Sequence, residues 1–204
     1  MGRIAITCLL VATLTASAAA KKTTNLYEDV WKSVVVYAVD ATAHCTAFAV
    51  RFDPALYVTA RHCFGDDVAL GTIDSAKVTV VAVSQELVAV TTTTGRQHPI
   101  LILGDRPQLG QYVTGMGYGG PYKVPFMYRG VYVGDYPVMG EERKLAVFQQ
   151  NFVGGMSGGP VVNDEGRVVS VMQCGASYGG HNADFGCGST YDETSDFIRQ
   201  VTAR

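Results

Sequence analysis

The stretch Gly154-Gly155-Met156-Ser157-Gly158-Gly159-Pro160 places one serine among four glycines, and an apolar run begins directly after it. Glycine permits the positive φ angles and the close chain approach that a tight turn of N–H donors requires. A serine in such a turn exposes its hydroxyl to a space that the neighbouring N–H groups also face. This combination supplies a nucleophile and donors for an oxyanion, which attack on a carbonyl needs. The alternative is a glycine-rich turn with a chance serine.

A candidate base lies in the stretch Tyr57-Val58-Thr59-Ala60-Arg61-His62-Cys63-Phe64, where a histidine follows an apolar strand and precedes a cysteine. A neutral imidazole accepts the proton of a serine hydroxyl. A disulfide at Cys63 would hold His62 rigidly in place. A structural histidine is the alternative, and the competing candidates, which lack a comparable context, are His44, His98 and His181.

The composition indicates a folded protein without a nucleic-acid partner. The 204 residues suffice for one large or two small cores. Hydrophobic residues make up 48% and charged residues 17% of the chain, which argues against disorder. The net charge is −2 and no basic run occurs, so binding of nucleic acid is not expected.

The first twenty residues have the order of a secretory signal. Arg3 precedes an apolar run from Ile4 to Leu14, and small residues follow up to Ala20. We expect residues 1–20 to be a signal peptide that is cleaved after Ala19 or Ala20, which predicts a secreted or periplasmic protein. An uncleaved anchor is the alternative. No later stretch is apolar enough to span a bilayer, so no stable membrane span is expected after signal removal.

Short runs rich in Val, Thr and Ile, separated by Asp, Gly, Pro or Ser, recur along the chain. A first set is predicted at Ser33–Val39, Thr46–Arg51, Ala55–Thr59, Lys77–Val83, Leu87–Thr91 and Ile100–Leu103. After a linker at residues 105–110, a second set is predicted at Gln111–Met116, Phe126–Val133, Lys144–Gln149, Pro160–Asn163 and Val168–Gln173. Short helices are expected near Trp31 and over Thr194–Val201. This pattern favours an all-β barrel or sandwich.

Two motifs resemble those of trypsin-like (chymotrypsin-fold) serine peptidases. The run from Thr59 to Cys63 resembles the T-A-x-H-C motif, and the run from Gly155 to Pro160 resembles the G-x-S-G-G-P motif. The similarity covers most of residues 30–175 and extends to the bacterial HtrA-type protease domain, without a PDZ-like segment. It implies a peptidase domain over residues 21–204. That domain would hold two six-stranded antiparallel β-barrels, about 30–105 and 110–190, and a short C-terminal helix.

The third catalytic position departs from the family pattern. The family has Asp at the start of a D-[LI]-A-[LV]-L strand, and the matching run here begins with Glu86. A carboxylate at this position would hold the tautomer of His62 and stabilise its imidazolium. Glutamate is one methylene longer, so its strand would have to lie further back. Other candidate acids are Asp66, Asp67 and Asp74.

The resemblance implies a secreted serine endopeptidase that acts on polypeptides through an acyl-enzyme. Ser157 would attack the carbonyl, His62 would act as base and then acid, and Glu86 would orient His62. The N–H groups of Gly155 and Ser157 would bind the oxyanion. Residues assigned to substrate binding are Asn151 at the pocket base, with Ser170, Val171 and Met172 along the wall. Met172 would narrow the pocket in favour of small or medium apolar side chains.

The cysteines suggest disulfides. Cys8 leaves with the signal, and an even number in an exported chain predicts two bridges, for which the sequence allows three pairings. The resemblance implies the pairs Cys45–Cys63 and Cys174–Cys187. A four-cysteine metal site is the alternative, but the chain lacks a C-x-x-C pair. We expect no metal or cofactor, and a monomer.

Two other functions compete with this hypothesis. Gly155, Ser157 and Gly159 also fit the G-x-S-x-G elbow of α/β-hydrolases, which needs its acid and histidine after the serine and a helix directly behind it. Here a strand follows instead. The second alternative is a catalytically impaired chymotrypsin-fold binding module, which the glutamate at position 86 favours.

Overall fold

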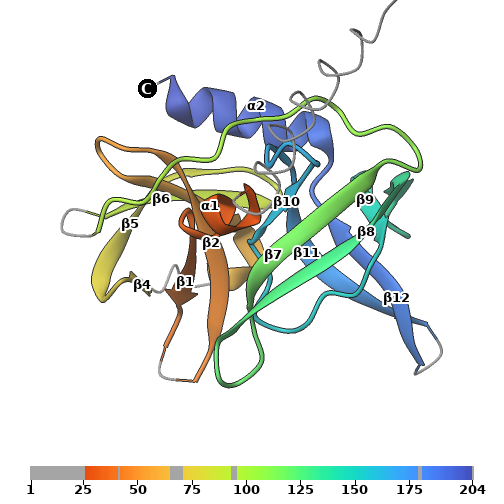
Figure 1. Ribbon diagram of the computed structural model, residues 1–204, viewed down its shortest axis with the longest axis horizontal. Coiled ribbons are helices and arrows are strands. Elements are labelled where there is room, and N and C mark those ends of the chain that lie inside the picture. Colours follow the sequence, from red (N-terminus) through yellow and green to blue (C-terminus); the bar gives the residue numbers. More distant parts are fainter. Residues whose placement is uncertain (1–25, 41, 65–70, 93–95, 179–180, 204) are drawn as a thin grey trace, which may run out of the picture.

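The protein forms two closed antiparallel β-barrels that lie side by side, as the computed structural model shows (Figure 1). The structure describes residues 26–40, 42–64, 71–92, 96–178 and 181–203. Strand order is β1-β2-β3-β6-β5-β4 in the first barrel and β10-β11-β12-β9-β8-β7 in the second. This arrangement, with one short C-terminal helix, confirms the predicted fold. The predicted signal peptide lies outside the described residues.

The described elements account for most of the chain between residues 26 and 202. The first barrel and its flanking helices comprise α1 (Leu26–Trp31), β1 (Val34–Ala38), β2 (His44–Arg51), β3 (Leu56–Ala60), the 3₁₀ helix η1 (Arg61–Phe64), β4 (Thr72–Ile73), β5 (Ala76–Val83) and β6 (Leu87–Thr92). The second barrel and the last helix comprise β7 (Tyr112–Gly119), β8 (Val124–Pro137), β9 (Lys144–Gln149), β10 (Pro160–Val162), β11 (Val168–Tyr178), β12 (His181–Gly188) and α2 (Tyr191–Thr202).

Several central strands are buried on both faces, because one face fills a barrel and the other packs between the barrels. All five residues of β3 are buried, with Tyr57 inside the first barrel and Val58 in the core between the barrels. That shared core also includes Met116 of the second barrel and Phe197 of α2. Strands buried on both faces have continuous apolar runs, which explains their clear signal in the sequence. The shared core fixes the relative position of the barrels and therefore of the site between them.

The predicted strand Ile100–Leu103 is not a strand of either barrel. Its side chains do alternate between buried and exposed positions, since Leu101 is buried while Ile100 and Ile102 are exposed. However, Leu101 N donates to Ala49 O of the first barrel, whereas Ile102 O accepts from Val168 N of the second. The segment therefore connects the barrels by bonding to both, with an isolated bridge between Leu103 and Val168.

Two strands were not predicted, and tertiary pairing stabilises both. β4 has only two residues, which pair with β1 and β5. β12 contains Gly186 and Gly188 and no β-branched residue, yet it pairs with both β9 and β11. The two β-branched residues of β4 are too short a run to predict a strand, and β12 lacks a strand-forming pattern, so both depend on the hydrogen bonds of neighbouring strands.

Helix α2 connects the two barrels. Its N-cap, Thr190, accepts a hydrogen bond from Glu193 N. The Glu193 carboxylate reaches the turn before β6, where Ser84 Oγ and Glu86 N donate to it at 2.9 Å each. The last helix therefore anchors the chain beside Glu86. Among the described residues no helix has the length and apolar character needed to cross a membrane.

Candidate active site

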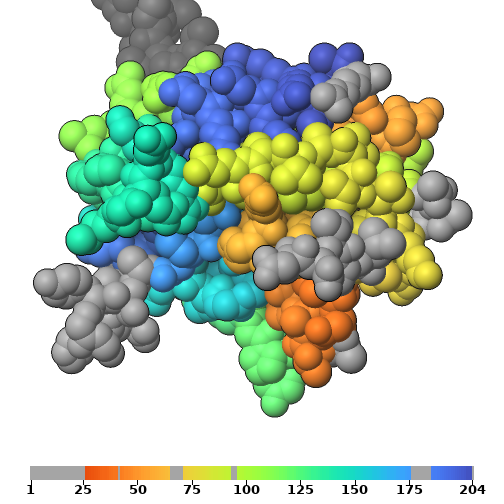
Figure 2. Space-filling view, turned by 180° about the vertical axis from the view of Figure 1, so that it is seen from behind, coloured from red at the N-terminus to blue at the C-terminus, as the bar shows by residue number. Residues whose placement is uncertain are grey.

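The barrels meet on the face seen in Figure 2, where the orange and yellow surface of the first barrel borders the teal to blue surface of the second. The predicted nucleophile belongs to the loop between β9 and β10 of the second barrel, and the predicted base belongs to η1 at the end of β3 in the first. The candidate site is therefore assembled from both barrels, and each half alone is incomplete.

The nucleophile loop is fixed against β2 by hydrogen bonds. Thr46 N donates to Ser157 O at 2.8 Å, and Thr46 Oγ1 donates to Gly155 O at 2.9 Å. Gly155 and Gly158 have φ angles of +95° and +84°, which favour glycine. A Cβ at Gly158 would lie 2.2 Å from Thr46 O, so a side chain has no room there. The glycines are thus required by the close approach of the two barrels.

Gly155 N and Ser157 N, the donors on either side of Met156, have no backbone acceptor within the described part of the chain. The N–H group that follows each of them is bonded, since Met156 N donates to Val153 O and Gly158 N donates to Met172 O. The loop therefore holds two free N–H groups beside the serine hydroxyl. These are the two donors that the sequence predicted for an oxyanion.

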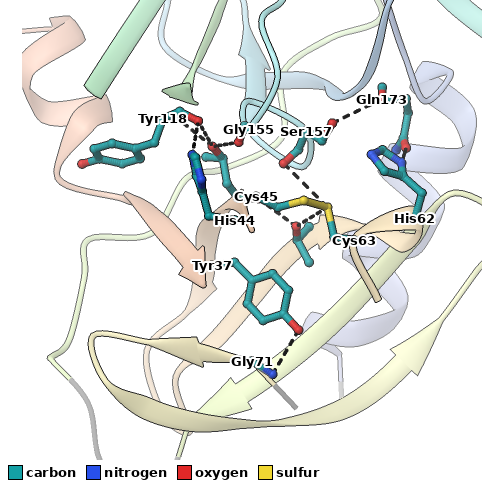
Figure 3. The surroundings of a disulfide bond; sticks show 12 residues. Tyr37, His44, Cys45, His62, Cys63, Gly71, Tyr118, Gly155, Ser157 and Gln173 are labelled. Atoms are coloured by element: carbon teal, nitrogen blue, oxygen red, sulfur yellow. Dashed lines mark hydrogen bonds between the residues drawn. A yellow bond between two sulfur atoms is a disulfide. The ribbon is translucent and has the colours of Figure 1, made fainter. Parts of the chain in front are cut away.

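His62 is held by the chain on both sides. Cys63 forms a disulfide with Cys45 of β2, and Arg61 N donates to Glu86 O at 2.8 Å. The His62 ring bonds through Nδ1 to Gln173 Oε1 at 3.2 Å (Figure 3). Burial lowers the pKa of His62, while the hydrogen bond to Gln173 and the charge of Glu86 oppose this shift. The net direction is downward, which favours the neutral imidazole that a base requires.

The competing histidines have other partners. His44 Nε2 lies 3.3 Å from Tyr118 O, and a Cβ at Gly155 would touch the His44 ring. His98 contacts Asp74 at 2.7 Å, on another part of the first barrel. The side chain of His181 lies outside the described residues.

Ser157 and His62 are both bonded to Gln173, at opposite ends of that residue (Figure 3). Ser157 Oγ donates to the backbone oxygen of Gln173 at 3.4 Å, whereas the His62 ring bonds to the side-chain oxygen. Sequence reasoning missed Gln173. The only signal was its position, as the polar residue that ends the apolar run of β11 beside Cys174.

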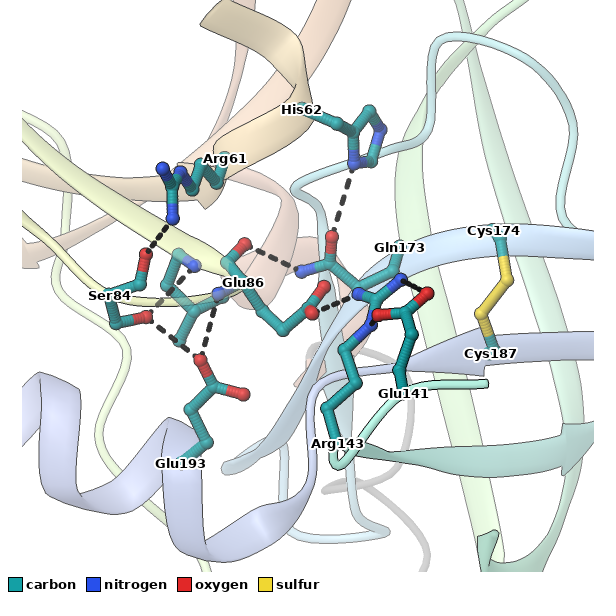
Figure 4. Close-up of polar contacts among 11 residues, drawn as sticks. Arg61, His62, Ser84, Glu86, Glu141, Arg143, Gln173, Cys174, Cys187 and Glu193 are labelled. Carbon is teal, nitrogen blue, oxygen red and sulfur yellow. Dashed lines mark hydrogen bonds and ion pairs between the residues drawn. A yellow bond between two sulfur atoms is a disulfide. The ribbon is translucent and has the colours of Figure 1, made fainter. Parts of the chain in front are cut away.

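The backbone of Glu86 lies beside that of Arg61, the residue before His62. The Glu86 carboxylate, however, points toward Arg143 and not toward the His62 ring (Figure 4). The buried carboxylate pairs with Arg143, which also pairs with Glu141. The backbone oxygen of Glu86 accepts a 3.0 Å hydrogen bond from Gln173 Nε2. The structure therefore does not bring the Glu86 carboxylate into the predicted contact with the His62 ring. Of the alternative acids, Asp74 pairs with His98, while Asp66 and Asp67 lie outside the described residues.

A pocket of about 210 Å³ opens beside Ser157. Its lining comprises Phe152, Val153, Gly154, Ser157, Met172, Gln173, Cys174 and Gly175. The Phe152 ring fills the space behind it, since a Cβ at Gly115 or Gly186 would lie within 2.6 Å of that ring. None of the described residues in this lining carries a charged side chain.

Only one of the four predicted substrate-binding residues reaches this pocket, namely Met172. Ser170 and Val171 are buried behind it, where Ser170 Oγ donates to Ser189 O and Val171 N donates to Ser189 Oγ. Asn151 precedes Phe152 and does not line the pocket. Along β11, Met172 and Gln173 reach the pocket while remaining buried, and the strand becomes exposed at Cys174.

A larger hollow of about 520 Å³ lies on the other side of Gln173 and Cys174. Its lining comprises Arg61, His62, Gln85, Glu86, Arg143, Leu145, Gln173 and Cys174. The two hollows share Gln173 and Cys174, so an extended chain lying in the cleft would pass along this edge of β11. The second predicted disulfide, Cys174–Cys187, is present and joins this edge to β12.

The family model for the trypsin-like peptidase domain matches residues 45–171, which is more than half of the chain. This chain belongs to the trypsin-like peptidase family. The assignment confirms the resemblance inferred from the histidine and serine motifs. The trypsin-like peptidase fold implies serine peptidase activity and polypeptide substrates. No curated protein matches the sequence.

Solved structures agree with the trypsin-like peptidase fold. The inactive form of Rv3671c protease is 17% identical with a TM-score of 0.70, and the match covers 86% of this chain and 91% of that one. A serine-to-alanine mutant of Rv3671c from M. tuberculosis H37Rv, also an inactive form, is 18% identical with a TM-score of 0.70. That match covers 89% of this chain and 92% of the other. At this identity the similarity concerns the fold alone.

Proposed function

We propose that the protein is a secreted or periplasmic serine endopeptidase that cleaves polypeptides through an acyl-enzyme at Ser157. The observation that carries this proposal is the junction at Gln173, where Ser157 of one barrel and His62 of the other bond to the same residue beside two free N–H groups. The histidine and serine motifs alone could not supply that juxtaposition.

The chemistry follows from these positions. Ser157 Oγ attacks the peptide carbonyl carbon while its proton moves to His62 Nε2, and the N–H groups of Gly155 and Ser157 bind the oxyanion. His62 then gives that proton to the leaving amine, and the acyl-enzyme forms. Water attacks the ester next, with His62 again as base. Glu86 contributes a negative charge that favours the imidazolium of these steps.

We further propose that the enzyme prefers a small or medium apolar residue before the scissile bond. The pocket beside Ser157 has a volume of about 210 Å³, and the side chains of Phe152 and Met172 limit its depth. A charged substrate side chain would find no counter-charge in this lining. Peptides that differ only at this residue test the preference, and a clear preference for Arg or Lys would refute it.

Export of the protein is supported by two disulfides, which persist in oxidising compartments. We propose that residues 1–20 are removed, so that the mature chain starts near Lys21. Intact mass of the protein recovered from the medium or periplasm tests this. A mass that retains the first twenty residues would contradict cleavage and favour an anchor.

Labelling with a serine-directed fluorophosphonate tests the peptidase activity. The wild-type protein is expected to gain one adduct by intact mass, and the Ser157→Ala variant none. The second candidate function is a catalytically impaired binding module, which is favoured by the pairing of the Glu86 carboxylate with Arg143 instead of His62. A folded, disulfide-bonded wild type that gains no adduct would support this second function.

A further inference from the structure

Gln173 makes three hydrogen bonds at the junction of the barrels; Figure 3 shows those with Ser157 and His62, and Figure 4 shows those with His62 and Glu86. Its backbone oxygen accepts from Ser157 Oγ, its Oε1 contacts His62 Nδ1 at 3.2 Å, and its Nε2 donates to Glu86 O at 3.0 Å. The residue is buried, with 6% of its surface exposed. Such a buried amide has little freedom to exchange partners.

The partners of the amide determine the tautomer of His62. A backbone carbonyl only accepts, so the amide group that faces Glu86 O must be the NH₂. The side-chain oxygen of Gln173 is therefore the group that faces His62. Because this oxygen also only accepts, the ring must carry a hydrogen on Nδ1. A neutral His62 then has its lone pair on Nε2, the nitrogen that takes the proton from a serine hydroxyl.

We propose that Gln173 is the positioning residue that orients His62, in place of a carboxylate. This inference rests on the proposed function. An amide that is free to rotate could turn its NH₂ to the ring and select the wrong tautomer, as happens when the acid of a catalytic triad is changed to its amide. Here the carbonyl oxygen of Glu86 prevents that rotation, because it holds the NH₂ group on the opposite side.

This arrangement separates two tasks that a single carboxylate normally performs. Gln173 sets the ring orientation and the tautomer, while Glu86 acts on the ring only through the charge of its carboxylate, which pairs with Arg143. During attack, the Ser157 proton moves to Nε2 and the Nδ1 hydrogen stays between the ring and Gln173 Oε1. The imidazolium thus keeps a hydrogen bond to a neutral oxygen and has no direct ion pair.

The test compares Gln173→Leu with a matched buried glutamine, Gln150→Leu. Gln150 is 4% exposed, and its two side-chain polar atoms have no hydrogen-bond partner within the described part of the chain, so its loss leaves no donor or acceptor there unpaired. Nitrogen-15 NMR of histidine reports the tautomer, and peptide hydrolysis reports kcat and KM. We expect the Nδ1–H tautomer in the wild type and in Gln150→Leu. In Gln173→Leu we expect a mixture of tautomers and a kcat lower by roughly a hundredfold.

Glu86→Gln distinguishes the two possible orienting residues, because it keeps the backbone oxygen that holds Gln173. We expect this variant to retain the Nδ1–H tautomer and to lose less than about tenfold in kcat. The proposal is overturned if Gln173→Leu keeps the tautomer and the kcat of the wild type, or if Glu86→Gln loses the tautomer instead.

Gln173→Glu provides a second test in case the leucine variant does not fold. A carboxylate at this position still accepts from Nδ1, and its charge stabilises the imidazolium. The acid limb of kcat/KM is therefore expected to move to higher pH with the tautomer unchanged, and an unmoved limb would contradict the proposal. Since the NMR signal does not require turnover, failure of the proposed function would show as absent labelling of a wild type that still has the Nδ1–H tautomer.

Discussion

Thr46 Oγ1, on β2 of the first barrel, donates a 2.9 Å hydrogen bond to the carbonyl oxygen of Gly155 in the nucleophile loop of the second barrel. The same hydroxyl oxygen accepts from Tyr118 N at 2.9 Å, and Thr46 is completely buried. One side chain therefore joins β2, β7 and the loop that carries Ser157. The position of Ser157 depends on this contact between the barrels.

Replacing Thr46 with valine tests this dependence. The variant keeps the shape but leaves Gly155 O and Tyr118 N without this partner, so we expect a loss of about 1–3 kcal/mol in the free energy of unfolding and a lower kcat. Urea denaturation and peptide hydrolysis measure the two effects. The control is Thr91→Val, which removes a hydrogen bond to Ala55 O at the far side of the barrel and should reduce stability without lowering kcat. An unchanged kcat in Thr46→Val would contradict the prediction.

The glycines of the nucleophile loop should differ sharply in their tolerance of alanine. Gly155 has a φ of +95°, and a Cβ there would lie 2.5 Å from His44 Nε2 and 2.8 Å from Tyr118 O. Gly154 has nothing within 4 Å of such an atom. We expect Gly155→Ala to lower the free energy of unfolding by at least about 1 kcal/mol and to abolish fluorophosphonate labelling, because the strained loop moves its N–H donors. Gly154→Ala should unfold like the wild type, and equal stability of the two variants would refute this account.

The two disulfides should differ in their kinetic effect. They close separations of 18 and 13 residues, and each is expected to contribute about 3 kcal/mol by loop closure. Changing Cys45 and Cys63 to alanine should also lower kcat, because Cys63 adjoins His62. Changing Cys174 and Cys187 should chiefly raise KM, because Cys174 lines both hollows of the cleft. Denaturation under non-reducing conditions measures the stability of the two variants, and steady-state kinetics measures kcat and KM. The same kinetic change in both variants would contradict the predicted difference.

The activity should persist at lower pH than an ordinary histidine permits. Burial lowers the pKa of His62, and catalysis needs its neutral form, so the acid limb of kcat/KM is expected below pH 6.5. In this window the unfolded chain binds more protons than the folded one, so stability also falls as the pH drops from about 6.5 toward the folded-state pKa. Glu86→Gln should move the limb to still lower pH, because the charge that opposes the shift is removed. A limb at or above pH 6.5 in the wild type would contradict this prediction.

Arg143 and Glu86 should stabilise the folded protein only when both are present. The Glu86 side chain is 6% exposed, so Arg143→Gln leaves a buried carboxylate without its partner and should cost about 3 kcal/mol. The double variant with Glu86→Gln should recover most of this loss, since no uncompensated charge remains. Urea denaturation of the two single variants and the double variant at neutral pH measures the coupling. If the losses of stability in the two single variants add up in the double variant, the ion pair is not the cause of the loss in Arg143→Gln.

The sequence alone predicted the features that depend on local pattern. The glycines around Ser157 and the apolar run before His62 marked these two residues as the candidate nucleophile and base, because those backbone requirements are visible in neighbouring residues. Most strands of both barrels followed from runs of β-branched residues, but β4 and β12 did not. The segment Ile100–Leu103 shows the limit of this method, since its alternation suits a strand but its partners belong to two different barrels.

Only the tertiary structure decided what faces His62. Glu86 occupies the position where its family carries the acid, but the partner of its carboxylate, Arg143, lies 57 residues away. Gln173 is 111 residues from His62 and gave no signal of its own. Hydrogen bonds and ion pairs between distant segments depend on how the two barrels pack, whereas turns and strands depend on adjacent residues. The local sequence therefore determined the barrels and the candidate nucleophile and base, whereas the packing of the barrels determined which group faces the candidate base.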